Sequence, residues 1–484
     1  MKPILFVFAA LSLAASVWGQ TVEETYPETL WCPNDTFALK FKGNPNLFRY
    51  PVSRKDNRSP GTDASLDNYI MVYYGTDSVK LLYNNKIPYA HNLYIRFESP
   101  KGKTTLRVHF NSIANYFTPE YMKKNLGNVR FDIPEVYELA NIIWTLSPSG
   151  QRASDLYNEG EYYKRMIAYF KPYMNHPVLK ALDFPDSLRA IKYYDFRENS
   201  FAFNFQDPKT GSANTTLLFN GPYYYGYGDE LADNSLFGKL KPLVEDFARK
   251  SKFRQFYKNN LVYYTKAIER EKHLLPVRQM WSWLEEQFPQ SQCQSYRVVF
   301  SPLIWRSHST QRYSTYDYPN NKWFTENVMF ICGTQQYDNM RGADEKQKEG
   351  LMSGILFTEI DHNYVNPATS HYTGQVDSIF TQRSFWAKRG NSSDFYTSSV
   401  SVFNEYMTHA VFCLYILSTY DKSTADYVIR QREELMVENR NFIKFKEFNR
   451  ELIRLSQEHK DLKAVDLYPY ILAWCKQTLP KAEQ

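Results

Sequence analysis

The feature that most constrains the fold is a change in hydrophobic period near residue 134. Before it, apolar and polar residues alternate in runs such as Tyr69–Tyr74, Leu93–Phe97 and Thr104–Phe110, which Gly, Asn and Pro residues separate. Alternation with a period of two is typical of half-buried β-strands. After it, "IPEVYELANIIWTLS" spaces its apolar residues three and four apart, as an amphipathic helix does. The sequence therefore predicts an α+β fold.

The helical period covers most of the remaining chain. Strand-like segments interrupt it at "YRVVFSPLIW" and "NKWFTENVMFICG", and it resumes over Asp344–Tyr364 and Ser399–Thr419. We therefore predict a β-rich N-terminal region over residues 20–128 and a mainly helical domain with a small sheet over residues 129–484.

The first residues predict the compartment. Lys2 precedes an apolar run from Ile4 to Val17, and small residues lead up to Gly19. This pattern is typical of a secretory signal peptide over residues 1–19, because the run is too short to span a bilayer. No later stretch is long enough to do so. The sequence therefore predicts a secreted or periplasmic protein without a transmembrane segment.

Composition excludes several classes of function. A formal net charge of +6 over 484 residues, without dense Lys/Arg blocks, argues against a nucleic-acid partner. None of the five cysteines forms a C-x-x-C pair, which excludes a zinc ribbon. The chain contains neither a G-x-S-x-G elbow nor a glycine-rich phosphate-binding loop.

Ionisable residues enter an apolar helix at "GILFTEIDHNYVNP", residues 354–367. Glu359 and His362 are three residues apart, so their side chains lie on one helical face. Pro367 cannot continue a helix, and we expect this one to end near Tyr364. A Glu-x-x-His pair is common by chance, and a hydrogen-bonded pair without chemistry is the default interpretation of this one.

A second helix carries the same two residue types. "SVFNEYMTHAVFCLYIL" has eight consecutive apolar or aromatic residues, Ala410–Leu417, and a helix that is apolar all round is buried. It nevertheless contains Glu405 and His409, one turn apart. A buried carboxylate must be protonated, paired or bound to a metal. Two such helices facing each other predict a polar network or a metal site.

The chain resembles a family of secreted bacterial proteins of uncharacterised function (a domain of unknown function) that is related to the gluzincin-like zinc metallopeptidases. The resemblance covers about residues 130 to 475. It rests on the order along the chain of "PEVYELANIIWTLS", "YYKRMIAYFKPYMNHPVL", "VVFSPL", "EIDHNYVNP", "FNEYMTHAV" and "LYPYILAWC". It implies a gluzincin-like metallopeptidase fold for the helical domain.

The resemblance also implies roles for single residues. Glu359 becomes the general base that activates a metal-bound water, His362 a zinc ligand, and Glu405 the ligand from the second helix. The His-Glu-x-x-His motif of gluzincins is degenerate here, because Thr358 stands where its first histidine would be. A neutral hydroxyl is a poor zinc ligand. Zinc binding is therefore expected to be weak, altered or lost.

Three interpretations of this departure remain. In the first, the hydrolytic site has decayed and its residues form a hydrogen-bonded network. In the second, His409 completes an altered zinc site from the second helix. In the third, Asp361 or His371 substitutes for the missing ligand.

The resulting functional prediction is a secreted zinc-metallopeptidase-like protein, a peptide hydrolase with a degenerate active site and a peptide or protein as its substrate. We also expect the strand around Asn327–Cys332 to pair with an extended substrate by its edge. The alternative is a non-enzymatic extracytoplasmic protein that binds a peptide or glycan through Tyr and Trp side chains. The sequence predicts neither further substrate-binding residues nor an oligomeric state.

Overall fold

The structure is a computed structural model that describes residues 22–41, 47–53, 69–82, 90–111, 117–224, 226–227, 231–317, 320, 322–390, 393–394 and 396–480. The predicted signal peptide, residues 1–19, lies outside the described residues.

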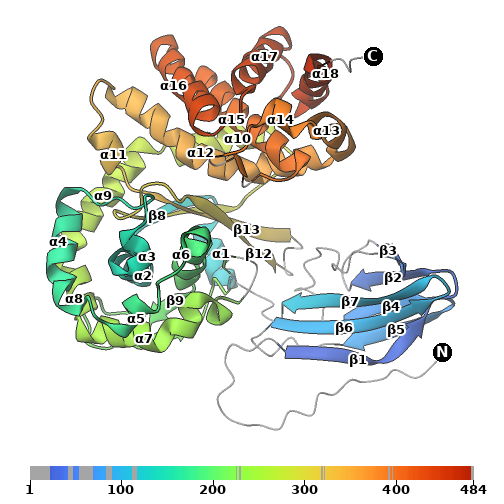
Figure 1. Cartoon of the computed structure of the whole chain (residues 1–484), viewed down its shortest axis with the longest axis horizontal. Helices are drawn as coiled ribbons and strands as arrows, with labels where there is room; N and C mark the ends of the chain where they lie inside the picture. Colours follow the sequence, from blue (N-terminus) through green and yellow to red (C-terminus); the bar gives the residue numbers. More distant parts are fainter. Residues whose placement is uncertain are drawn as a thin grey trace.

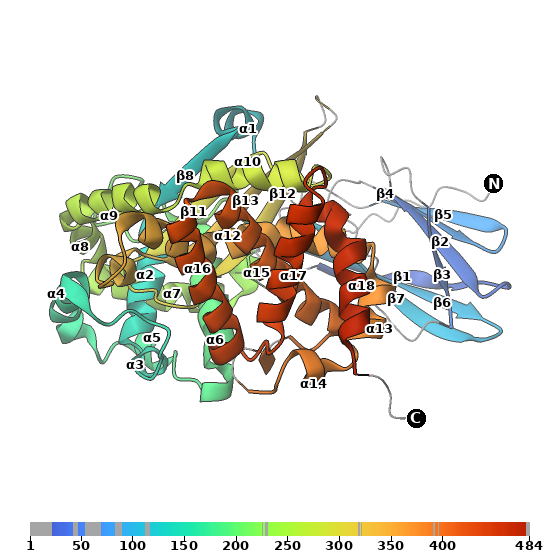
Figure 2. The ribbon, with the colours of Figure 1, turned by 90° about the horizontal axis from the view of Figure 1, so that it is seen from above.

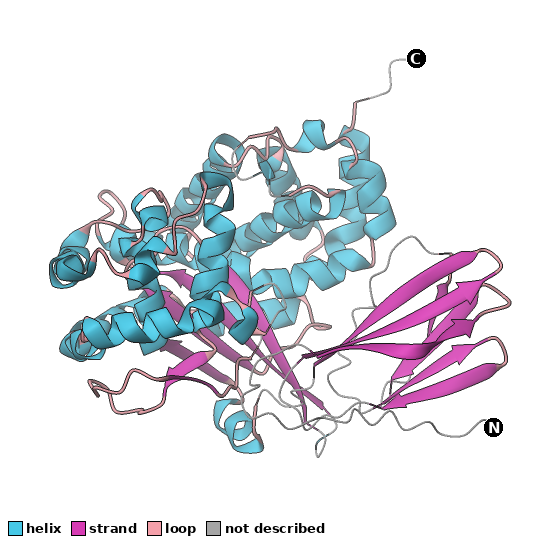
Figure 3. Ribbon diagram, turned by 60° about the horizontal axis from the view of Figure 1, so that its bottom comes forward, coloured by secondary structure: helices cyan, strands magenta, loops and turns pink. Residues whose placement is uncertain are grey.

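Two sheets form the N-terminal region. One has the order β1-β6-β7, with β1 parallel to β6, and the other is antiparallel with the order β3-β2-β4-β5. Their strands lie together on one side of the molecule (Figures 1 and 3). The strands are β1 (Val22–Trp31), β2 (Thr36–Phe41), β3 (Phe48–Pro51), β4 (Tyr69–Tyr74), β5 (Asp77–Leu82), β6 (Ala90–Ser99) and β7 (Gly102–Asn111).

Alternate side chains of these strands form a core between the two sheets. Ile70 and Val72 on β4 and Ile95 and Phe97 on β6 are buried together, and the residues between them point outward. This is the packing expected of an antiparallel sheet with one solvated face. The predicted β-rich N-terminal region is confirmed.

A second four-stranded sheet lies within the helical part of the chain. Its order is β12-β13-β11-β8, with β11 parallel to both neighbours and β12 antiparallel to β13. The strands are β8 (Asn128–Asp132), β11 (Ser295–Ser301), β12 (Ser309–Asp317) and β13 (Lys322–Cys332). The expected edge pairing around Asn327–Cys332 is wrong, because β11 and β12 occupy both edges of β13. The edge strands are β12 and β8, neither of which the sequence analysis predicted.

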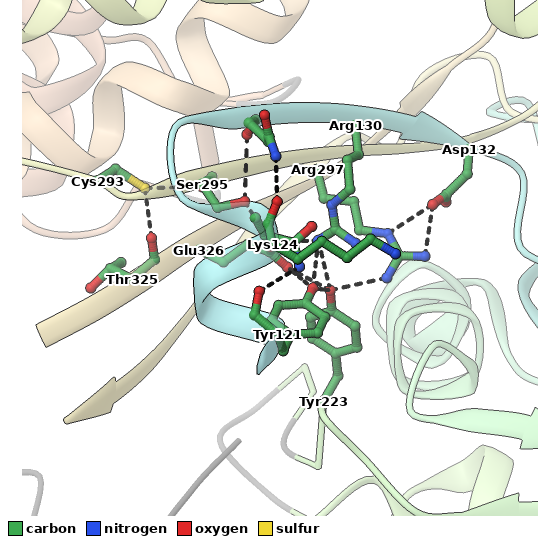
Figure 4. Close-up of polar contacts among 12 residues, drawn as sticks. Tyr121, Lys124, Arg130, Asp132, Tyr223, Cys293, Ser295, Arg297, Thr325 and Glu326 are labelled. Carbon is green, nitrogen blue, oxygen red and sulfur yellow. Dashed lines mark hydrogen bonds and ion pairs between the residues drawn. The ribbon is translucent and has the colours of Figure 1, made fainter. Parts of the chain in front are cut away.

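A buried polar network, here called the sheet cluster, joins three strands of this sheet (Figure 4). Arg130 on β8 lies opposite Arg297 on β11 in the strand register. Glu326 on β13 pairs with Arg130 at 2.5 Å, and Asp132 pairs with Arg297 at 2.7 Å. Tyr223 donates to Glu326, so each charge of the sheet cluster has a partner.

Helices make up most of the chain between β8 and β11. They are α1 (Pro119–Asn125), just before β8, and then α2 (Glu135–Leu146), α3 (Pro148–Gln151), α4 (Gly160–Phe170), α5 (Pro177–Lys180), α6 (Asp186–Ser200), α7 (Leu236–Lys250), α8 (Phe253–Asn259), α9 (Leu261–Leu274) and α10 (Val277–Gln287). A short hairpin of β9 (Phe203–Phe205) and β10 (Leu217–Phe219) lies among them. Tyr121 of α1 hydrogen-bonds Glu326, so the chain enters this part ahead of residue 129.

The chain after β13 is helical to its last described residues. Its helices are α11 (Gln335–Asp338), α12 (Glu345–Ser370), α13 (Thr373–Phe380), α14 (Arg383–Trp386), α15 (Ser399–Thr419), α16 (Lys422–Glu434), α17 (Phe445–Glu458) and α18 (Tyr468–Thr478). The predicted α+β class, with a mainly helical C-terminal part, is confirmed.

Helix α12 continues six residues past its predicted end. We expected Pro367 to stop it near Tyr364, but Pro367 lies inside the helix, which ends at Ser370. One tertiary contact holds the end of the helix: the Tyr468 hydroxyl of α18 donates to the Val365 carbonyl at 3.2 Å. The Thr369 hydroxyl donates to the same carbonyl from within α12, at 3.0 Å. Packing against α18 therefore overrides the local cost of the proline.

Helix α15 lies at the centre of the C-terminal helices, packed against α12, α13, α16 and α17 (Figures 1 and 2). Within the described part of the chain, α15 alone is long and apolar enough to cross a membrane, and 78% of its most apolar window is buried inside the protein. Its enclosure by four helices explains why it is apolar all round.

Candidate functional site

Helices α12 and α15 bring together the ionisable residues that the sequence singled out. Glu405 of α15 is buried, and its Oε1 lies 3.6 Å from His362 Nε2 of α12. Its other oxygen, Oε2, lies 3.2 Å from His409 Nε2, one turn further along α15. Glu359 and His362 lie on one face of α12, and the charges of His362 and Glu405 both act on the Glu359 carboxyl. The chemical roles assigned to these residues remain predictions.

Glu405 is held in its ionised form. Burial alone would favour the neutral acid, but the Arg440 guanidinium, 3.0 Å from Oε2, and the hydrogen bond from His409 lower the pKa of Glu405 well below its usual range. A carboxylate in contact with a guanidinium and an imidazole is the arrangement that makes burial of its charge affordable.

The pKa of Glu359 is shifted in the opposite direction from that of Glu405. Burial raises its pKa to about 7, and the carboxylates of Glu405 and Glu198 add to the effect, while His362 and Arg440 oppose it. The charge of Glu359 also acts on Tyr194 of α6, so α6 lies near this part of the site. A carboxyl with a pKa near neutrality can either accept or donate a proton at physiological pH.

His409 lies between two arginines. The Arg432 Nη1 donates to its Nδ1 at 3.0 Å, and the Arg440 Nη1 lies against its Nε2. Burial lowers the pKa of His409 to about 3, and both guanidiniums add to this shift. The imidazole is therefore neutral, and each ring nitrogen already has a protein partner.

Thr358 turns away from the site. Its hydroxyl donates back along α12, to the carbonyls of Gly354 at 2.9 Å and Ile355 at 3.1 Å. This local hydrogen bond is a common use of a threonine inside a helix. The hydroxyl that replaces the first histidine of the gluzincin motif is therefore engaged by the helix itself.

The two substitute ligands considered for the third interpretation differ in position. Asp361 is fully buried on α12, and burial together with the nearby Glu405 raises its pKa well above its usual range. His371 is exposed at the C-terminal end of the same helix, more than two turns beyond His362.

The site also contains two arginines that the sequence analysis did not predict. Arg432 lies in α16 and Arg440 follows a π-helical turn over Leu435–Asn439, directly after that helix. Arg440 Nη2 also donates to the Tyr396 hydroxyl at 2.8 Å. In the sequence both arginines stand among polar residues, where a solvent-exposed helical face is the ordinary expectation. No pattern in one sequence signals that the packing of α16 directs Arg432 inward, or that the π-turn does so for Arg440.

We call Glu405, His409, Arg432 and Arg440 the helix cluster.

The residues that the gluzincin pattern assigns to a metal do not fit a tight zinc site as they are arranged here. His362 Nε2 and Glu405 Oε1 are close to the separation of about 3.3 Å expected for two ligands of a tetrahedral ion. A catalytic zinc, however, takes three protein ligands. Neither Thr358 nor His409 supplies the third, because both are engaged elsewhere.

Comparison of the chain with protein-family models, with curated proteins and with solved structures finds no match.

Proposed function

We propose that this chain is a secreted zinc-metallopeptidase-like protein of the gluzincin type whose hydrolytic activity is lost or altered, and whose site between α12 and α15 contacts a peptide. The observation that supports it is the convergence of Glu359, His362 and Glu405 from two buried helices. The resemblance to gluzincin-like proteins assigns these same three positions to the active site.

The proposal takes account of two departures from that pattern. Thr358 donates its hydroxyl within α12. The Arg440 guanidinium pairs with Glu405 on the side that faces His409. A positive charge at that place supplies the electrostatic partner that the buried carboxylate requires.

Elemental analysis of the purified protein tests this proposal. We expect far less than one equivalent of zinc, because only His362 and Glu405 remain as ligands. The variant Thr358→His, alone and combined with Arg440→Gln, restores the missing imidazole and removes the competing cation. Zinc and peptide hydrolysis should be gained in the double variant.

A control variant, Gln375→His, adds a histidine on α13 at an exposed position outside the site and should gain no zinc. If neither variant at position 358 gains zinc, the gluzincin assignment fails. One equivalent of zinc in the unaltered protein would show instead that the site rearranges around a metal.

A second candidate function is non-enzymatic binding of a peptide or glycan. The position of Arg440 favours it, because a guanidinium in contact with Glu405 and His409 serves binding and not activation of water.

A further inference from the structure

Strand β8 leaves one edge of the four-stranded sheet unpaired. Its hydrogen-bonded neighbour on one side is β11, and among the described residues no strand pairs with its other side. Val129 and Phe131 of β8 are half-buried, and Asn128 at the start of the strand is exposed. The backbone N–H and C=O groups at such an edge can pair with a further extended strand.

An open groove of about 750 Å³ lies beside this edge, between β8 and α10. Figure 2 shows the two elements close together at the rim of the molecule. The residues that make the lining of the groove mainly apolar are Val129, Phe131, Leu275, Val277 and Trp283. Edge strands commonly carry charged side chains that prevent association. The two charged side chains of β8, Arg130 and Asp132, lie on its other face, where their ion pairs belong to the sheet cluster.

The face of α10 that lines the groove carries opposite charges at its two ends. Arg278 lies in the first turn of the helix and Glu286 in the last, and both residues are exposed. The helix rises about 12 Å between them. Arg278 donates to the Gly127 carbonyl at 2.7 Å, and among the described residues neither Arg278 nor Glu286 has an oppositely charged partner within ion-pair distance. Both charges are therefore available to a partner.

We infer that the β8 edge and the adjacent face of α10 form the interface of a dimer with a second copy of this chain. A two-fold axis brings a surface against its own rotated copy, so the surface has to be complementary to itself. The β8 edge meets this condition, because two copies related by such an axis pair as antiparallel strands. The α10 face meets it as well, because the rotation reverses the direction of the helix and places Arg278 of each copy opposite Glu286 of the other. The apolar side chains of the second β8 then enter the groove.

Sedimentation equilibrium of the unaltered full chain is the first test. At about 100 µM, where an interface with a Kd of micromolar order is mostly occupied, we expect the mass of two chains. The mass of a single chain at this concentration overturns the inference. This arm needs no variant, so it does not depend on the folding of an altered chain.

Two charge reversals locate the interface. Arg278→Glu and Glu286→Arg each place like charges opposite one another at both symmetric contacts, so each variant alone should dimerise about tenfold more weakly or less. An equimolar mixture of the two variants restores opposite charges at both contacts and should recover the dimer. Lys422→Glu is the matched control, since Lys422 is an exposed cation on α16, outside the groove, and it should leave dimerisation unchanged. Full dimerisation of both single variants, or a mixture of the folded variants that recovers no dimer, overturns the inference.

Hydrogen–deuterium exchange separates a second copy from other occupants of the groove. The amides of β8 that point away from β11 should exchange faster on dilution from about 100 µM to about 1 µM, because the dimer dissociates. Protection that does not change with concentration would show that another part of the same chain covers the edge, and a dimer without protected β8 amides would use a different surface. A monomer whose β8 amides become protected only with an added alternating valine–threonine peptide would assign the groove to peptides. Each of these three results overturns the inference.

Discussion

The sheet cluster and the helix cluster each bury two arginines, but they balance them differently. In the sheet cluster, Arg130 pairs with Glu326 and Arg297 with Asp132, so two cations face two carboxylates. In the helix cluster, Arg440 pairs with Glu405, and Arg432 has only a neutral imidazole at hydrogen-bond distance. The sheet cluster is closed, in the sense that each of its charged side chains has an oppositely charged partner. In the helix cluster, Arg432 has no such partner within ion-pair distance among the described residues.

This difference in charge balance affects how much each cluster contributes to the stability of the fold. The ion pairs of the sheet cluster cross three strands and support the register of β8, β11 and β13. In the helix cluster, Arg432 has no carboxylate within ion-pair distance among the described residues, so its removal leaves no carboxylate unpaired. The comparison therefore predicts a larger loss of stability when the sheet cluster loses a carboxylate than when the helix cluster loses Arg432.

The largest expected loss of stability comes from breaking the sheet cluster. The substitution Glu326→Ala leaves Arg130 without its carboxylate and Tyr121 and Tyr223 without their acceptor. We expect a loss of about 2–4 kcal/mol in the free energy of unfolding, measured by urea denaturation, because a partly buried cation and two tyrosine hydroxyls lose their partner. The double variant Arg130→Met/Glu326→Met should lose much less. An equal loss in both would show that the ion pair does not determine the effect.

A smaller effect tests how closely the helix cluster is packed. Gly354→Ala forces a methyl group against Arg432 and the Phe412 ring, and we expect it to cost about 1–3 kcal/mol by urea denaturation. Gly374→Ala on α13 is the control. No heavy atom lies within 4 Å of the Cβ added there, so alanine should be neutral or stabilise the helix by up to about 1 kcal/mol. Equal stability of the two variants would mean that Arg432 does not occupy the space beside Gly354.

The sequence was most informative where local pattern and tertiary structure agree. The predicted strand Tyr69–Tyr74 and helix Ser399–Thr419 have the bounds that the structure gives to β4 and α15. Alternation identifies the first, and the second is so apolar that only burial explains it. Helix α12 shows the limit, because contacts with α18 carry it through Pro367, and those contacts are distant in sequence.

The candidate site was only partly predictable for the same reason. Glu359, His362, Glu405 and His409 follow helical spacing on two buried helices, so their approach could be expected. The position of Arg432 depends on the packing of α16 against α12 and α15, and that of Arg440 on the π-turn that follows α16. Neither leaves a periodic signal, and β12 was missed because its residues are mostly polar.

Glu359, on α12 beside the helix cluster, should make the stability of the chain depend on pH. The pKa of Glu359 is about 7 in the folded chain, above its ordinary value of 4.5, so the folded chain binds the proton more tightly. Its contribution to stability is therefore complete below pH 4.5 and is lost as the pH rises through 7. Between pH 5 and pH 8, the unaltered chain should lose on the order of 1–2 kcal/mol more than Glu359→Gln, with allowance for solvent at this half-buried side chain. Parallel pH profiles of the two proteins would contradict this.

The smallest expected change in stability is that of Arg432→Met, and it is compared directly with the loss in Glu326→Ala. Arg432→Met removes a cation that has no carboxylate partner, so no buried charge is left behind. The substitution loses a hydrogen bond to His409 but relieves an unneutralised charge, and the two terms oppose each other. We expect the free energy of unfolding to stay within about 1 kcal/mol of that of the unaltered chain, far from the loss in Glu326→Ala. A loss as large as that of Glu326→Ala would mean that Arg432 holds an ionised partner, and the helix cluster would then be as closed as the sheet cluster.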